Sequence, residues 1–402
     1  MPECARTVCV VTGGRADYGL LVPLLTRIAA DPALRLKIVA CGTHVSPAFG
    51  MTVREMEADG FPPDEIVEAL VSADTPTSVC KSMGLSLIGF GDAYRRLSPD
   101  LVLVLGDRYE ILAAATAALI CRIPLAHIAG GQLTAGAVDD SIRHAITKMA
   151  ALHFTAVEDY ARRILQMGEE PGHVHVTGAL GLDNVRTTPL LSRDELECDL
   201  GFSFGDPAVL ATYHPETLDE EDGDAGLTAM LEALDARPGL RVLFTLPNAD
   251  AGSWALRRRI EEFAGARSGR CLAVASLGRR RYLSALACVD AVIGNSSSGL
   301  IEAPSFALPV VNIGDRQAGR IRAANILDCL PDGRAVADAL DRALSVEFRR
   351  SLHGLRNPLG DGHAAERITD ILKTAPLEGL IRKRFNDMAF PFPSPCPSRS
   401  EP

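Results

Sequence analysis

The stretch TVCVVTGGRADYG, residues 7–19, joins a short apolar segment to a pair of glycines and the start of an amphipathic segment. This order is typical of the strand, turn and helix that open a βαβ unit. Further apolar segments, each followed by helical periodicity, predict a parallel sheet in the first half of the chain. The expected strands there are residues 7–11, 36–40, 101–105, 125–128, 152–155 and 174–177.

The same alternation restarts in the second half, where the expected strands are residues 208–212, 241–245, 271–275, 291–293 and 310–312. A chain of 402 residues is longer than one hydrophobic core usually covers. We therefore expect an α/β protein of two Rossmann-like parallel-sheet domains, with a boundary between residues 178 and 194. Residues 391–402 hold five prolines among polar residues, and we expect this tail to be disordered.

Composition argues against several classes of protein. The formal net charge of −10 argues against nucleic-acid binding, since phosphate contacts need clustered Lys and Arg. The apolar segments are too short to cross a bilayer, and the first residues do not resemble a secretion signal. The ten cysteines form no CxxC pair, so we expect buried free thiols in a reducing, cytoplasmic setting and no zinc site.

Two motifs of the first half place polar side chains where strands end, which is where open α/β sheets bind ligands. Arg15 follows the glycines of the first turn, which can bind an anion together with the helix N-terminus or can be purely structural. Asp107, Arg108 and Glu110 follow the strand at 101–105. Their position favours a ligand site over a helix cap with a surface ion pair.

The loop and helix after residues 125–128 carry Gln132 and Asp139. Spacing does not separate a catalytic Asp139 from one that caps the helix, because Asp is common at the first turn of helices. In the second half, His214 follows the first expected strand. An imidazole at that place can act as acid, base or phosphate partner.

The stretch GNSSSGLIE, residues 294–302, follows another expected strand of the second half. Ser296, Ser297 and the helix amides suit a diphosphate, and Glu302, one turn inside the expected helix, suits two ribose hydroxyls. A serine N-cap with a nearby carboxylate is the structural alternative. Arg316 follows the next strand and adds a candidate charge to the same site.

Taken together, these motifs resemble those of the hydrolysing UDP-N-acetylglucosamine 2-epimerases of bacterial sialic and legionaminic acid pathways. The resemblance covers residues 8–386. It rests on GGRADYG, GTHVSPAFG, GDRYE, HIAGG, DDSIRHAITK, TGALGLDN, HPET, PNADAGS, GNSSSG and IRKRFND, in that order. So many motifs in one order are far more specific than any one of them.

The resemblance implies a GT-B-like fold with an interdomain cleft. Residues 1–182 are then the N-terminal domain with the sugar and catalytic residues, 183–364 the UDP-binding domain, and 365–390 a helix that packs back on the first domain. The implied reaction removes the C2 proton while UDP leaves C1, and then adds water to the glycal with inversion at C2. The implied partner is a UDP-sugar, with no metal or redox cofactor, no nucleic acid and no membrane, in a homodimer or homotetramer.

Matching motifs assign proton transfer to Asp107, Asp139 and His214, with Glu110 and Gln132 in the same catalytic set. They assign the UDP moiety to Arg15, Arg108, Asn248, Ser296, Ser297, Glu302 and Arg316. Many relatives have glutamate at the position of Ala129 and an acid at that of Gln132, and an amide cannot act as a general base. A catalytically impaired UDP-sugar-binding protein and a GT-B glycosyltransferase therefore stay open as alternatives.

We expect Gln132→Glu to raise turnover on at least one UDP-N-acetylhexosamine. Nearby carboxylates would push the pKa of the new acid upward, into the range useful for proton transfer. Kinetics on UDP-N-acetylglucosamine and on a 4-acetamido-6-deoxy analogue measure the effect. Lower turnover on both substrates would instead make Gln132 a specificity or hydrogen-bonding residue.

Overall fold

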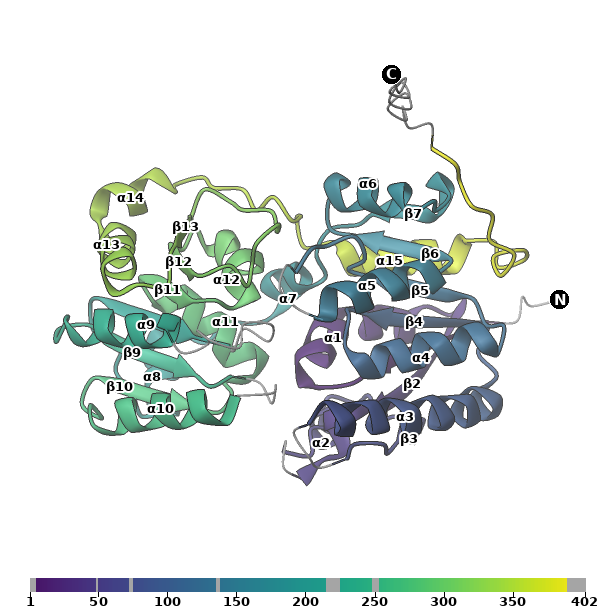
Figure 1. Cartoon of the computed structure of the whole chain (residues 1–402), viewed down its shortest axis with the longest axis horizontal. Coiled ribbons are helices and arrows are strands. Elements are labelled where there is room, and N and C mark those ends of the chain that lie inside the picture. The colour runs from purple at the N-terminus through teal and green to yellow at the C-terminus, as the bar shows by residue number, and fades with distance from the viewer. Residues whose placement is uncertain are drawn as a thin grey trace, which may run out of the picture.

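The computed structural model describes residues 5–47, 50–71, 75–134, 138–214, 225–247 and 253–388. Within these residues the chain forms two parallel sheets, each with helices on both faces (Figure 1). The first sheet has the strand order β3-β2-β1-β4-β5-β6-β7, with β1 (Arg6–Thr12), β2 (Leu34–Cys41), β3 (Glu65–Val67), β4 (Leu101–Leu105), β5 (Leu125–Ile128), β6 (Leu152–Thr155) and β7 (Val174–Val176). The second has the order β10-β9-β8-β11-β12-β13, with β8 (Ala208–Thr212), β9 (Arg241–Thr245), β10 (Cys271–Val274), β11 (Ala291–Gly294), β12 (Val310–Ile313) and β13 (Ile326–Cys329).

Helices follow most strands, as the βαβ pattern predicts. Those before β8 are α1 (Arg15–Ala30), α2 (Val53–Ala58), α3 (Pro76–Leu97), α4 (Tyr109–Ile120), α5 (Val138–Met149), α6 (Glu158–Gln166), α7 (Gly181–Thr187) and α8 (Arg193–Leu200). Those after β8 are α9 (Ala225–Asp235), α10 (Ser253–Gly265), α11 (Gly278–Cys288), α12 (Ser297–Ile301), α13 (Gly333–Leu344), α14 (Val346–Ser351) and α15 (Ala364–Thr374). The two-domain α/β architecture expected from the sequence is confirmed.

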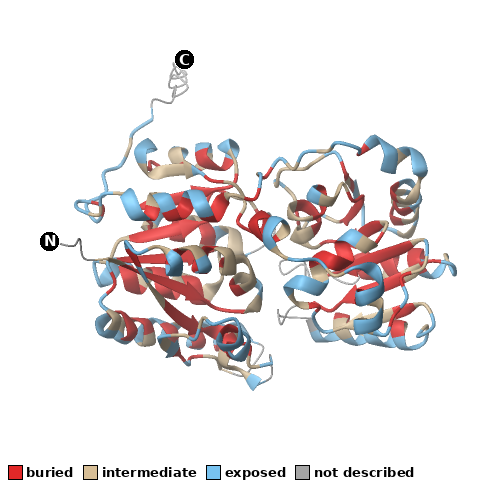
Figure 2. Ribbon diagram, turned by 180° about the vertical axis from the view of Figure 1, so that it is seen from behind, coloured by how far each residue is buried: buried red, intermediate tan, exposed pale blue. Residues whose placement is uncertain are grey.

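Each sheet is buried on both faces because successive strand residues point to opposite sides. In β1, Val8 and Val10 pack with α1 and α15, whereas Cys9 and Val11 pack with α3 and α4. Figure 2 shows the strands of both sheets as the most deeply buried elements. Two-sided burial explains why these strands appear in the sequence as continuous apolar segments.

Two strands were missing from the sequence prediction, and both lie at sheet edges. β3 pairs with β2 alone, and β13 pairs with β12 alone. Each strand is short and carries a charged residue, Glu65 in β3 and Asp328 in β13. An edge strand needs less apolar surface, so its sequence shows no apolar segment.

The predicted helix at residues 365–390 is wrong in length. α15 ends at Thr374, and a turn and an extended segment follow it up to the last described residue, Met388. The cause is Pro376: it restricts Ala375, which has an extended conformation with ψ 129°, and so ends the helix. The prediction that the tail at 391–402 is disordered concerns residues outside the described part of the chain.

The expectation that the cysteines are buried holds for only some of them. Among the described cysteines, Cys9, Cys41 and Cys271 are buried, whereas Cys80, Cys121 and Cys198 are exposed. The exposed ones lie on or at the ends of surface helices, where the local sequence does not reveal which side faces the core.

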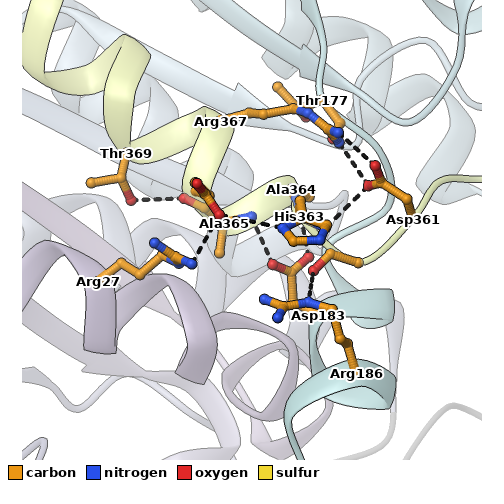
Figure 3. A network of polar contacts seen from close by, with 12 residues as sticks. Arg27, Thr177, Asp183, Arg186, Asp361, His363, Ala364, Ala365, Arg367 and Thr369 are labelled. Atoms are coloured by element: carbon orange, nitrogen blue, oxygen red, sulfur yellow. Dashed lines mark hydrogen bonds and ion pairs between the residues drawn. The ribbon is translucent and has the colours of Figure 1, made fainter.

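The chain crosses between the two sheets through α7 and returns through the segment before α15. Asp183 of α7 accepts hydrogen bonds from the backbone N–H groups of Ala364 and Ala365, both at 3.0 Å (Figure 3). α15 has no side-chain cap of its own, since its N-cap residue His363 makes none. Asp183 therefore caps the returning helix from 181 residues earlier in the chain.

Replacing Asp183 with Ala should lower the free energy of unfolding by about 2 kcal/mol or more, because it leaves two buried helix amides without an acceptor. The matched control is Asp332→Ala. Asp332 also accepts two helix amides, but it is exposed and caps its own helix, α13. Denaturant unfolding measures both variants, and equal losses would contradict a special role for the crossing.

Candidate active site

The candidate site lies where the strand order of each sheet reverses. β1 has β2 on one side and β4 on the other, and β8 lies in the same way between β9 and β11. Ligands of open α/β sheets bind at the carboxyl ends of strands at such switch points. The switch points bring together the loops after β1 and β4 in the first sheet, and those after β8 and β11 in the second.

Asp107, just after β4, forms an ion pair with Arg143 of α5. The Arg143 side chain is 3% exposed and that of Asp107 is 20% exposed. Arg143 also donates from Nη1 to the carbonyl oxygen of Gln132 at 3.1 Å and to Oγ1 of Thr134 at 3.0 Å. The α4 N-cap is Arg108, so the structural alternative of Asp107 as a helix cap is wrong.

Burial, with the nearby charge of Arg320, lowers the pKa of Arg143 to about 9. The guanidinium therefore stays charged at neutral pH. A buried cation is stable only when it is paired, and Asp107 supplies the partner. The pair leaves the Asp107 carboxylate anchored on one side and partly open on the other.

Asp139 and Asp140 both lie in the first turn of α5, which begins at Val138. Asp140 accepts the backbone N–H of Thr134 at 2.7 Å, so it fixes the loop that precedes the helix. Asp139 stands near Arg320, and its negative charge acts to raise the pKa of that guanidinium. Asp140 therefore has a structural role at the start of α5.

Glu110 has a buried carboxylate beneath the first glycine turn. Its side chain is 1% exposed, and its Oε1 accepts from Nε of Arg108 at 2.6 Å. A Cβ atom added at Gly13 would lie 2.6 Å from this oxygen, and one added at Gly42 would lie 3.2 Å from it. The glycine of the first turn therefore gives room to Glu110, not directly to a ligand as the sequence suggested.

Arg15 follows this turn and reaches toward the second sheet. Its Nη2 lies 3.1 Å from Oε1 of Glu55, and a Cβ atom added at Gly278 would lie 2.9 Å from the same nitrogen. Asp17 accepts the backbone N–H of Gly13 at 2.7 Å and so holds the turn. Arg15 is thus a positive charge between the two domains.

His214 follows β8 and is held by Asn295, which follows β11. Asn295 accepts the backbone N–H of His214 at 2.7 Å and donates to its carbonyl oxygen at 2.8 Å. The carbonyl of Asn295 in turn accepts from Arg316 at 3.2 Å and from Gln317 at 2.8 Å. The candidate residues His214 and Arg316 are therefore brought together through Asn295.

Ser296 is the N-cap of α12, and its hydroxyl accepts the backbone N–H of Ser298 at 3.4 Å. The structural alternative for this serine is therefore realised, while Ser297 begins the helix. α12 spans only Ser297–Ile301, so Glu302 is its C-cap residue and not, as predicted, a residue inside it.

The carboxyl group of Glu302 is enclosed near the crossing between the domains. A Cβ atom added at Gly181 would lie 3.0 Å from its Oε1, and its Oε2 is buried with no hydrogen-bond partner among the described residues. Burial raises the pKa of Glu302 to about 7. An unsatisfied buried carboxyl oxygen is costly, which is typical of a group kept for binding.

The structure gives little information on the side chains of two predicted site residues, Asn248 and Gln132. Asn248 lies outside the described residues. Gln132 lies in the loop after β5, where its carbonyl oxygen binds Arg143. Ala129, at the end of β5, has φ 69°, a left-handed conformation that is rare for a residue with a Cβ atom. The backbone directly after β5 therefore has an unusual conformation at Ala129.

Sequence reasoning assigned no role to Arg143 or Arg320. Arg143 stands three residues after Asp140, and a cation at this spacing after two acids on one helix is the signal that could have found it. Arg320 comes from the loop after β12 and binds Leu133 and Thr134 of the first domain. Local sequence patterns do not predict a contact between residues as far apart in the chain as Arg320 and Thr134.

Among the described residues, no group of three His, Cys, Asp or Glu side chains could hold a metal ion. Nor is any helix in the described ranges long and apolar enough to cross a membrane.

His127 is buried, donates to the Gly106 carbonyl oxygen at 2.8 Å, and has a pKa lowered by burial to about 3. It supports the loop after β4 in its neutral form.

Two Rossmann-like domains with polar residues after the strands define the GT-B-like class, and solved structures share this fold. The UDP-GlcNAc 2-epimerase from Neisseria meningitidis, solved with UDP-GlcNAc bound, matches with a TM-score of 0.78 at 17% identity, over 91% of this chain and 99% of that one. The Methanocaldococcus jannaschii UDP-GlcNAc 2-epimerase, in complex with UDP-GlcNAc and UDP, matches with a TM-score of 0.74 at 17% identity and the same coverage. At such identities the likeness shows the fold alone.

The family model described as UDP-N-acetylglucosamine 2-epimerase matches residues 26–373, and this chain belongs to that family. The GDP/UDP-N,N'-diacetylbacillosamine 2-epimerase (hydrolyzing) of Campylobacter jejuni is 38% identical over 384 residues, 95% of this chain and 99% of the relative. The UDP-N,N'-diacetylbacillosamine 2-epimerase (hydrolyzing) of Legionella pneumophila is 35% identical over 381 residues, with the same coverage. The family and enzyme class predicted from the sequence are confirmed, and neither alternative is favoured.

Glu302→Gln should melt at a higher temperature than the wild type at about pH 8, with a difference that disappears towards about pH 5. Because the pKa of the folded group is raised to about 7, the stability it contributes is present below its ordinary pKa of 4.5 and is lost as the pH rises through 7. Glutamine cannot ionise and avoids this loss. Calorimetry across this pH range, with exposed Glu347→Gln as control, tests it, and a pH-independent difference would contradict it.

Proposed function

We propose that this chain is a hydrolysing 2-epimerase that converts a UDP-N-acetylhexosamine to UDP and the free manno-configured sugar. The observation that carries the proposal is the buried Arg143 holding Asp107 at the switch point of the first sheet. A carboxylate fixed in this way can exchange a proton at C2 of a sugar whose nucleotide is held by the second domain. Family membership supports the same reaction.

The second sheet supplies the proposed nucleotide half. Ser296 and Ser297 at the start of α12 offer hydroxyl and amide donors to the diphosphate. Glu302 would accept the ribose hydroxyls, which gives its unsatisfied Oε2 a partner. Arg316, with Arg15 and Arg108 from the first domain, would compensate the charge of UDP, and Asn248 would contribute a neutral hydrogen-bonding group to the same moiety.

The first sheet supplies the proposed proton-transfer half. Asp107 and Asp139 are the candidate acid and base, and His214, which follows β8 of the second domain, is a further candidate for proton transfer. Glu110 is better suited to orient Arg108, since its carboxylate is enclosed beneath Gly13 and bonded to that guanidinium. Gln132 would contribute hydrogen bonding, because an amide cannot take up the proton.

The sugar we propose is a 4-acetamido-6-deoxy derivative of UDP-N-acetylglucosamine. The Campylobacter and Legionella relatives are named for N,N'-diacetylbacillosamine, which is such a sugar. An Escherichia coli relative, 35% identical over 369 residues, is named as a polysialic acid biosynthesis protein. The product would therefore enter the synthesis of a nonulosonic acid, in the cytoplasm where nucleotide sugars and free thiols are found.

We further propose that the chain assembles as a homodimer or homotetramer. α3 and α4 pack against each other and expose Leu85, Ile88 and Ile120, the last at 74%. Exposed apolar side chains on two helices that pack together are of the kind that symmetric assemblies bury.

Release of UDP without an acceptor, followed by mass spectrometry of the sugar, tests the proposed reaction. Asp107→Asn should lower turnover by ~10²- to 10⁴-fold and leave UDP affinity nearly unchanged. Glu302→Ala should do the reverse and weaken UDP binding, because its carboxylate is assigned to the ribose. Full turnover in Asp107→Asn, or no UDP release by the wild type from any UDP-N-acetylhexosamine, would refute the proposal.

A further inference from the structure

One loop of the second domain docks directly on the loop that precedes α5 in the first. Arg320, in the loop after β12, donates from Nε to the carbonyl oxygen of Leu133 at 3.3 Å and from Nη2 to Oγ1 of Thr134 at 3.1 Å. The backbone N–H of Ile321 also donates to the hydroxyl of Tyr160 at 3.3 Å. Three hydrogen bonds therefore cross between the domains within two consecutive residues of this loop.

The same loop is shaped for close approach. Gly319 has φ 78°, a conformation that favours glycine. A Cβ atom added there would lie 3.0 Å from Cδ1 and 3.1 Å from Cβ of Leu133. Any other residue at 319 would both strain the backbone and push the two loops apart.

Thr134 links this docking to Asp107. Its hydroxyl oxygen accepts from Arg320 of the second domain and from Arg143 of the first. A hydroxyl oxygen has two lone pairs, so it can accept both donors at once. Arg143 then carries the contact to the carboxylate of Asp107.

The other end of the loop reaches the proposed nucleotide site. Arg316 and Gln317 both donate to the carbonyl oxygen of Asn295, and Asn295 holds the backbone of His214. Residues 314–322 thus contact Asn295, which holds His214 in the second domain, and Thr134, which binds Arg143 in the first. Arg320 does not touch Asp107 itself.

The guanidinium groups of Arg143 and Arg320 share the Thr134 hydroxyl, and their like charges repel each other. Burial and then the charge of Arg316 lower the pKa of Arg320 to about 10, whereas Asp139 and Asp140 act in the opposite direction. The carboxylates at the start of α5 therefore offset part of this repulsion.

We propose that Arg320 is a positioning residue that couples the approach of the two domains to the placement of Asp107 through Thr134 and Arg143. This inference rests on the proposed function of Asp107. With Arg320 docked, Thr134 and Arg143 have one fixed arrangement. Without it, Thr134 loses an anchor from the second domain, and the Asp107 carboxylate is held only from within the first.

Arg320→Met, which keeps the length of the side chain but removes its donors, should lower kcat on the order of 10²-fold, as expected for a misplaced catalytic group. UDP affinity should remain near that of the wild type. The matched control is Arg322→Met, because the described partners of Arg322, which are Asp328 and the carbonyl oxygens of Gln317 and Arg320, all belong to its own domain. Its loss of kcat should be much smaller.

A double-mutant cycle separates positioning from a merely structural effect. Arg320→Met and Thr134→Val should have non-additive effects on kcat, whereas Arg322→Met and Thr134→Val should add. Additive effects for the first pair, or a kcat of Arg320→Met equal to that of the wild type, would overturn the proposal.

Hydrogen exchange tests the docking without reference to activity. Arg320→Met should speed exchange of the backbone amides at residues 131–134 in the UDP-bound protein, and Arg322→Met should not. Unchanged exchange would overturn the docking even if the wild type is active. If the wild type releases no UDP from any substrate, the proposed function fails, while faster exchange would still establish the contact between domains.

Discussion

Every pair of neighbouring strands in the two sheets is parallel, and this constraint places the candidate site. Parallel strands end at the same edge, so polar residues that follow different strands come close although the sequence separates them. The order β2-β1-β4 brings the turn of Arg15 beside that of Asp107, and the order β9-β8-β11 brings His214 beside Asn295. The chemistry of the site therefore follows from where the strand order reverses.

Arg143 and Glu110 are buried near the strand ends of the first sheet, and each has a charged partner that is more exposed. Arg143 is paired with Asp107, and Glu110 is paired with Arg108. Losing one member of such a pair leaves the other buried and uncompensated, which costs far more than the pair itself contributes. The pairs thus specify one arrangement of side chains more than they raise stability.

Oε2 of Glu302, like Oε2 of Glu110, is buried without a hydrogen-bond partner within the described parts of the chain, and burial raises the pKa of Glu302 to about 7. The raised pKa is the sign of that cost. Such a group lowers the stability of the free protein but could gain hydrogen bonds from a ligand. Groups of this kind are typical of sites that favour binding over stability.

The sequence by itself determined the two-domain α/β fold and the strands of the sheet interiors, because strands that are buried on both faces require continuous apolar segments. It also determined the family, because many motifs occur in one order. It also placed Asp107, His214 and Ser296 at strand ends. Only the tertiary structure decided that Gly13 makes room for Glu110, that Arg143 holds Asp107, and that Arg320 reaches Thr134 from 186 residues away. These contacts join distant parts of the chain, and local periodicity and spacing carry no information about which distant side chains will meet.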